Sequence, residues 1–92
     1  MAGKFEARLE LDDIGAAAEV FGKHDEHLAQ IEKVLGVRFV ARGQELVITG
    51  DSERVEQARE VLTQLQKFYR AGNRLTVHEV SYAIKAAQGG IS

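Results

Sequence analysis

Alternating apolar and polar positions open the chain and predict a strand over Lys4–Leu11. The apolar positions of this segment are Phe5, Ala7, Leu9 and Leu11. Charged residues stand between them, and a period of two is typical of a strand with one face in the core and one in solvent. Asp12 or Asp13 then offers a carboxylate that can cap the free N–H groups of a following helix.

Helical spacing follows the first strand. The alanine-rich run 14–21 predicts a short helix that ends at Gly22, because glycine readily adopts the left-handed angles of a helix end. A second helix is predicted over 24–35, and Gly36 ends it. The apolar stripe expected on this helix consists of Leu28, Ile31, Val34 and Leu35.

Two more strands and a long helix come next. The segments Val37–Arg42 and Glu45–Thr49 read as strands joined by a tight connection at Gly43–Gln44. A long helix is predicted over 52–71. The apolar face expected on it consists of Val55, Ala58, Val61, Leu62, Leu65, Phe68 and Tyr69.

The last helix, predicted over 77–87, has the best-defined start. Thr76 and Glu79 have the spacing of a capping box, in which each side chain bonds to the backbone of the other residue. Leu75 and Val80 take the two positions of a hydrophobic staple. The apolar stripe expected on this helix consists of Val77, Val80, Ala83, Ile84 and Ala87.

These elements predict an α+β fold of order β-α-α-β-β-α, with a three-stranded sheet, helices packed on one of its faces and one additional C-terminal helix. The first six elements span residues 4–71. The additional helix, 75–88, is expected to pack on them or to lead to a further domain. The expected core contains Phe5, Leu9, Leu28, Ile31, Phe39, Ile48, Leu62 and Leu65.

Composition narrows the function classes. A chain of 92 residues that is 45% hydrophobic and 28% charged is typical of one globular domain. It has no cysteine, no apolar run of about 20 residues and no apolar signal-peptide core at its start, so we expect a cytoplasmic domain with no membrane partner. The net charge of -2 disfavours a strong free-standing nucleic-acid binder. Any phosphate-binding role therefore depends on a local patch.

The turn between the first two predicted helices resembles that of the KH domain. The KH pattern is Gly-x-x-Gly, two spaced aliphatic residues, a later glycine and a strand. In this chain the turn is Gly22-Lys23-His24-Asp25, the aliphatic residues are Leu28 and Ile31, and the later glycine is Gly36. The element order is also that of type I KH domains. In that family the glycine turn lets a nucleic-acid backbone come close while helix N–H groups face its phosphates.

A more specific resemblance covers the chain from about Arg8 to Ile84. The segments that carry it are Leu9–Asp13, Phe21–Asp25, Ile31-Glu32, Leu35–Val37, Ala41–Gly43, Ile48–Asp51, Leu75-Thr76 and Val80–Ile84. They look like the N-terminal region of PhoH-like proteins, which place a KH-like domain ahead of a P-loop ATPase domain. The resemblance implies an accessory domain that contacts single-stranded RNA weakly and positions it for an ATPase domain absent from this chain. Its partner would be that ATPase domain of the same parent chain. We expect ATP and Mg to bind to the ATPase domain and no cofactor to bind to this chain.

The turn departs from the KH pattern at its second glycine. Asp25 stands there and Glu26 follows, and both carboxylates would repel a phosphate. The alternative is therefore a protein-interaction or oligomerisation domain, with a homo-oligomer as one candidate, that binds no nucleic acid. The residues predicted to bind RNA are Gly22, Lys23, His24, Lys33, Arg38 and Arg42.

The sequence predicts neither a catalytic residue nor a metal site. His24 and His27 can share a helix face, but a closed zinc site needs about four ligands. The Walker A pattern Gly-x-x-x-x-Gly-Lys-Ser/Thr is absent, as is a serine in a Gly-x-Ser-x-Gly elbow. The chain is therefore not expected to be an enzyme by itself, whereas its parent protein would bind ATP.

Overall fold

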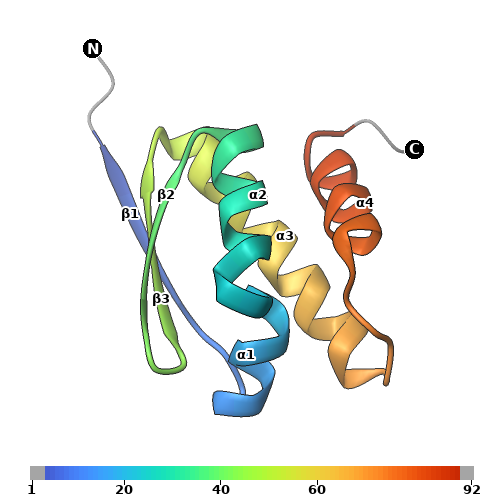
Figure 1. The fold of residues 1–92 in the computed structure, drawn as a ribbon. Coiled ribbons are helices and arrows are strands. Elements are labelled where there is room, and N and C mark those ends of the chain that lie inside the picture. The colour runs from blue at the N-terminus through green and yellow to red at the C-terminus, as the bar shows by residue number, and fades with distance from the viewer. Residues whose placement is uncertain (1–3, 90–92) are drawn as a thin grey trace.

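The computed structural model describes residues 4–89, which form three layers (Figure 1). A sheet forms the first layer, three helices cover one of its faces, and the last helix packs on the far side of these helices. The elements are β1 (Phe5–Glu10), α1 (Ile14–Phe21), a 3₁₀ turn (Lys23–Asp25), α2 (Glu26–Leu35), β2 (Arg38–Arg42), β3 (Glu45–Gly50), α3 (Ser52–Arg70) and α4 (Val77–Ala87). This is the α+β fold predicted from the sequence, with the type I KH order and one additional C-terminal helix.

The sheet is antiparallel and has the order β1-β3-β2, so β3 lies in the middle and the other two strands form the edges. Its covered face carries the buried residues Ala7, Leu46 and Ile48. Its open face carries the charged residues that alternate with them. Arg8 lies on that face, and its guanidinium is 3.3 Å from the carboxylate of Glu6 and 3.5 Å from that of Glu45.

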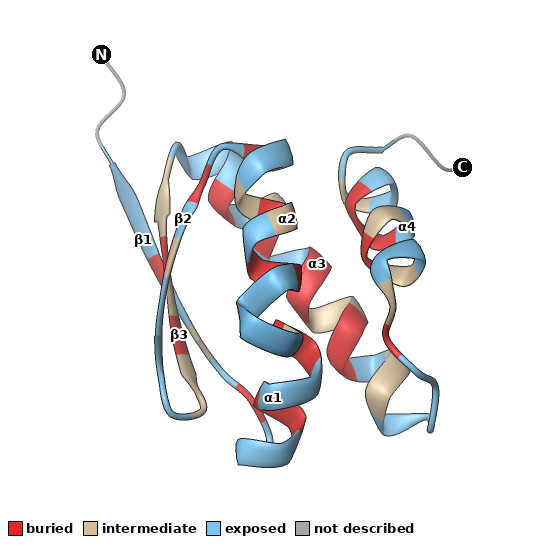
Figure 2. Cartoon of the chain, in the orientation of Figure 1, coloured by how far each residue is buried: buried red, intermediate tan, exposed pale blue. Residues whose placement is uncertain are grey.

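Helix α3 supplies the centre of the core. Its residues Val55, Ala58, Val61, Leu62 and Leu65 have no exposed surface, and buried segments of the neighbouring elements face it (Figure 2). Among the predicted core residues, the structure buries Leu28, Ile31, Ile48, Leu62 and Leu65. Leu9 and Phe39 are partly buried against this cluster, as are Phe68, Tyr69 and Ala87. No helix within residues 4–89 has the length and apolar character needed to cross a membrane.

Three residues predicted on apolar faces are exposed. Phe5 is 42% exposed because it lies at the end of an edge strand, opposite Gly50, which has no side chain to cover it. Val34 is 49% exposed. The buried stripe of α2 includes Leu35, and Val34 points about 100° away from it around the helix. Val77 is the first residue of α4, so no preceding turn of this helix lies beneath its side chain, and it is 54% exposed.

The start of α4 matches its prediction. Thr76 Oγ1 accepts a hydrogen bond from the His78 N–H at 3.2 Å, and the Glu79 carboxylate accepts one from the Thr76 N–H at 2.8 Å. A further hydrogen bond from the Thr76 hydroxyl to Glu79, together with this backbone bond, lowers the pKa of the Glu79 carboxyl below its ordinary value. Leu75 and Val80 of the hydrophobic staple are both buried.

We expect Thr76→Ala to lower the free energy of unfolding by about 1 kcal/mol, because the first turn of α4 loses its cap. Thr63→Ala is the matched control. Thr63 lies inside α3, and among the described residues its side chain bonds only to the Arg59 carbonyl one turn earlier, so alanine should be tolerated there. Urea unfolding of both variants tests this expectation. An unchanged stability of Thr76→Ala would mean that the cap contributes nothing to the domain.

Candidate functional site

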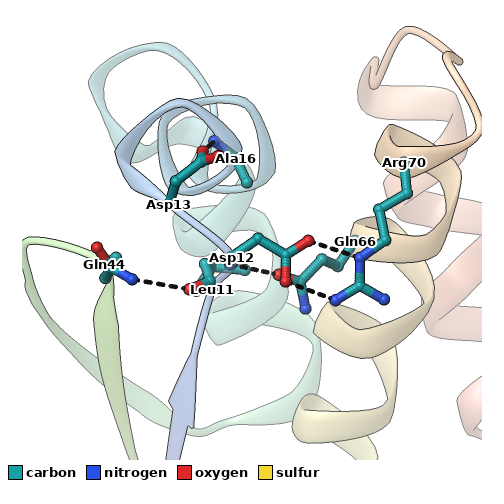
Figure 3. A network of polar contacts seen from close by, with 7 residues as sticks. All are labelled: Leu11, Asp12, Asp13, Ala16, Gln44, Gln66 and Arg70. Atoms are coloured by element: carbon teal, nitrogen blue, oxygen red, sulfur yellow. Dashed lines mark hydrogen bonds and ion pairs between the residues drawn. The ribbon is translucent and has the colours of Figure 1, made fainter.

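A polar network fixes the direction in which the chain leaves β1 and enters α1 (Figure 3). The Leu11 N–H donates to the Gln44 carbonyl at 2.8 Å, and the Gln44 side-chain amide donates to the Leu11 carbonyl at 3.1 Å. The next residue, Asp12, donates its N–H at 2.9 Å to the side-chain oxygen of Gln66, which is buried on α3. The β2–β3 hairpin and α3 thus hold the start of α1 from two sides.

Arg70 adds an ion pair to this network. Its Nε and Nη2 atoms donate to the two carboxylate oxygens of Asp12 at 2.6 and 2.7 Å (Figure 3). These hydrogen bonds lower the pKa of the Asp12 carboxyl below its ordinary value; the charge of Arg70 adds to the effect and partial burial opposes it. The pair joins the β1–α1 junction to the C-terminal end of α3, next to the connection that leads into α4.

Asp13, and not Asp12, caps α1. Its carboxylate accepts a hydrogen bond from the Ala16 N–H at 2.7 Å. The helix ends where the Gly22 N–H donates to the Ala18 carbonyl. Gly22 has φ 84° and ψ 168°, a conformation essentially confined to glycine. The prediction that α1 ends at Gly22 is thereby confirmed, with backbone angles that differ from those of an ordinary left-handed helix end.

The imidazole of His27 lies directly against Gly22. A Cβ atom built on Gly22 would be 2.7 Å from Cγ of that ring, which is closer than real side chains approach each other. His27 is 4% exposed, and its Nδ1 is 3.1 Å from the Val20 carbonyl oxygen. The histidine at the start of α2 therefore packs on the glycine at the end of α1, and the two residues fix the angle between these helices.

The prediction of a helix starting at residue 24 is wrong by two residues. His24 (φ 54°, ψ 33°) and Asp25 (φ 56°, ψ 31°) both adopt left-handed angles, so α2 begins at Glu26. Left-handed angles cost a residue with a side chain about 1–2 kcal/mol. Asp25 also makes no side-chain hydrogen bond to the first turn of α2. Its carboxylate therefore does not cap this helix, and the first N–H groups of α2 are not satisfied by it.

An open groove runs beside this turn. One side is formed by residues of α1 between Gly15 and Glu19, and by residues between Gly22 and Lys33, which belong to the turn and to α2. On the other side, the end of α3 and the connection into α4 contribute residues from Tyr69 to Val77. The side-chain amide of Gln30 links α2 to α4, donating to the Ser81 hydroxyl at 3.0 Å. The additional C-terminal helix thus takes part in forming the groove.

The groove has a positive local balance. Its lining includes the cations Lys23, Lys33 and Arg74 and the anions Glu19 and Glu26. Three positive charges and two negative ones leave +1, against -2 for the whole chain. Among the ion pairs that the structure has within residues 4–89, none involves one of these three cations. Their charges are therefore available to an anionic ligand.

The six residues predicted to bind RNA separate into two groups. Gly22, Lys23 and Lys33 line the groove, and His24 lies exposed on the turn beside them. Arg38 and Arg42 are exposed on β2 and alternate with Phe39, which packs against the core, so they lie on the open face of the sheet. The structure therefore gathers the first four near the groove and places the two arginines on a different surface.

The wall of the groove formed by residues 69–77 has no signal in the local sequence pattern. Local pattern identifies Gly72-Asn73 as the end of a helix, and the capping box identifies the next one. Neither signal indicates that Arg74 lies beside α1 and α2, because that depends on how α4 packs.

Within residues 4–89, no group of three His, Cys, Asp or Glu side chains could hold a metal ion. His24 is exposed and His27 is buried, so the two do not form a shared face.

Comparison with known proteins gives similarity at the level of sequence and at the level of structure. No family model matches the chain. A PhoH-like protein of Bacillus subtilis is 33% identical over 72 residues, which are 78% of this chain and 23% of the relative. The chain is a distant homologue of the N-terminal region of that protein and spans about a quarter of its length. A solved structure of a protein of unknown function from Aeropyrum pernix matches with a TM-score of 0.70, over 94% of this chain and 48% of that chain. At 15% identity, this second match shows a shared fold alone.

Proposed function

We propose, from its distant homology to part of a PhoH-like protein, that the chain is a KH-like accessory domain of a larger ATPase and holds single-stranded RNA weakly for that ATPase domain. ATP and Mg would be bound by the rest of the parent protein. The RNA site would centre on the turn from Gly22 to His27. The observation that carries the proposal is that Gly22, Lys23 and Lys33 line one open groove, and that neither lysine belongs to an ion pair within residues 4–89.

The conformation of the turn supports this location. His24 and Asp25 are consecutive left-handed residues with side chains, and strained backbone of this kind is concentrated at ligand-binding sites. The first turn of α2 also has N–H groups that the Asp25 side chain does not cap. Such groups, at the positive end of a helix dipole, favour a phosphate. Lys23 adds a side-chain cation directly beside them.

The acidic residues explain why we expect the affinity to be low. Glu26 lines the groove, and Asp25 is exposed on the turn, so each carboxylate would stand near a bound phosphate. Asp25 keeps the left-handed backbone that glycine adopts easily, although it replaces the second glycine of the KH turn. Asp25→Gly should therefore remove both a repelling charge and backbone strain.

We expect Lys23→Ala to weaken RNA binding and Asp25→Gly to strengthen it. Two or three phosphate contacts to a single strand correspond to a log–log salt slope of about -1.4 to -2, and removal of Lys23 should make it less steep by about 0.7. Fluorescence anisotropy with a labelled oligouridine at several salt concentrations measures both quantities. Arg42→Ala, which removes an arginine from the open face of the sheet, should have a smaller effect than Lys23→Ala.

Amide chemical shifts locate the site independently. During titration with the same RNA, the largest shifts should come from residues 22–27. Shifts confined to the helices after Asp51, or tighter binding by Lys23→Ala, would contradict the proposal and favour a protein-interaction domain.

A further inference from the structure

We propose that the connection between α3 and α4 forms the second wall of the RNA site, and that Arg74 contacts a phosphate of the strand held at Gly22–Lys23. This inference rests on the proposed function and extends it to a part of the chain outside the six elements of the KH order. The strand would lie in the groove between the α1–α2 turn and the start of α4.

The placement of residues 72–77 carries this inference. Arg74, Thr76 and Val77 line the same groove as Gly22 and Lys23, although about fifty positions separate them in the sequence. The two walls are held together by buried contacts: Val80, Ala83 and Ile84 of α4 belong to the core cluster. The Gln30 side chain also donates to the Val77 carbonyl at 3.4 Å and to the Ser81 hydroxyl at 3.0 Å. The second wall is thus a fixed part of the domain.

Charge identifies the occupant as an anionic strand. Lys23 and Lys33 line the groove on the side of α2, and Arg74 lines it on the opposite side. Arg74 is exposed, and the ion pairs found within residues 4–89 do not include it. An exposed arginine outside these ion pairs offers several N–H donors in a planar fork that matches the geometry of a phosphate. A backbone with successive phosphates can therefore be contacted from both walls at once.

Small residues of α1 and α2 line the groove on the same side as Lys23. These are Gly15, Ala18 and Ala29, and Ala18 and Ala29 are exposed. A longer side chain on Ala18 would project from α1 without disturbing the core. Position 18 therefore allows the charge inside the groove to be changed in either direction while the cations on both walls stay intact.

The first test compares Arg74→Ala with Arg54→Ala. Arg54 is an exposed arginine at the start of α3. Within residues 4–89 its side chain bonds only to Gln57, and it is not among the described residues that line the groove. Loss of one phosphate contact should weaken oligouridine binding about three- to tenfold at roughly 50 mM salt and make the salt slope less steep by about 0.7. We expect this result for Arg74→Ala and no change for Arg54→Ala. Thermal unfolding of both variants shows that the domain remains folded.

The second test reverses the charge at one position. Ala18→Lys should tighten binding and Ala18→Glu should weaken it, because the two side chains have similar length and opposite charge in the same groove. Both residues are good helix formers, so α1 should tolerate either. Equal effects of the two substitutions would indicate a steric change, and would overturn the path of the strand through the groove.

The outcomes separate this inference from the function on which it rests. If the native domain does not bind oligouridine, or if Lys23→Ala has no effect, the proposed function fails. If Lys23→Ala weakens binding while Arg74→Ala and both Ala18 variants behave like the native domain, RNA binds at the turn but does not contact the connection between α3 and α4. That result would support the proposed function and contradict the present inference. In the double variant Lys23→Ala/Arg74→Ala we expect the losses of RNA affinity of the two single variants to combine. Its log–log salt slope should be less steep than that of the native domain by about 1.4.

Discussion

Ile31→Ala is expected to lower the free energy of unfolding by about 2–5 kcal/mol. Ile31 has no exposed surface and lies on the buried stripe of α2 between Leu28 and Leu35. Alanine would remove three side-chain carbons from a closely packed region that cannot fully collapse around the gap. Since small domains are stable by only about 5–15 kcal/mol, this single change would remove a large share of the total.

Val34→Ala in the same helix is the matched control. Val34 is 49% exposed, so its truncation should change the free energy of unfolding by less than about 0.5 kcal/mol. Urea unfolding followed by far-ultraviolet circular dichroism measures both variants under the same conditions. A loss below about 0.5 kcal/mol for Ile31→Ala, or a larger loss for Val34→Ala, would show that α2 buries a different face.

The elements that could be predicted from sequence are those whose signal is local. The capping box and staple define the start of α4 because their residues lie within one helical turn of each other. The sequence also places Val61, Leu62 and Leu65 of α3 in the core, because apolar residues that recur with the helical period along one segment mark a single buried face. The residues whose exposure differs from the pattern, such as Phe5 and Val77, lie at the ends of elements, where a neighbour needed to cover the side chain is missing.

The candidate site could be predicted only in part, because it depends on packing. The sequence predicts Lys23 because it stands in a turn that resembles the KH pattern. It does not predict Arg74, since only the packing of α4 on α2 and α3 brings this residue to the groove. Arg38 and Arg42 follow the alternation of a strand, and that alternation assigns them to the open face of the sheet. His27 has a polar side chain, and nothing in its sequence neighbourhood indicates that its ring is buried against Gly22.

The contact between His27 and Gly22 gives the turn glycine a structural role of its own. The ring atoms Cγ, Nδ1 and Cδ2 of His27 would be 2.7, 2.8 and 2.9 Å from a Cβ atom at Gly22. The ring is held by α2 on one side and by the Val20 carbonyl on the other, so it cannot move away freely. Glycine is therefore needed at this position whether or not a nucleic-acid backbone approaches the turn.

Gly22→Ala should consequently be among the most damaging single substitutions in the chain. The backbone conformation at φ 84° and ψ 168° costs a residue with a side chain about 1–3 kcal/mol, and the overlap with the imidazole adds a similar amount. Together they predict a loss of about 2–6 kcal/mol in the free energy of unfolding. Gly36→Ala is the comparison for an ordinary left-handed helix end without steric overlap: Gly36 has φ 71° and ψ 28°, and a Cβ there would have no neighbour within 4 Å among residues 4–89.

A double-mutant cycle with His27→Ala separates the steric part of this loss from the conformational part. Removal of the ring abolishes the overlap but leaves the backbone angles of residue 22 unfavourable for alanine. Gly22→Ala/His27→Ala should therefore be more stable than the sum of the two single losses predicts, by at least about 1 kcal/mol. Strict additivity of the two substitutions, or a loss for Gly22→Ala no larger than that for Gly36→Ala, would contradict this packing. The requirement for glycine at this position would then come from its backbone angles alone.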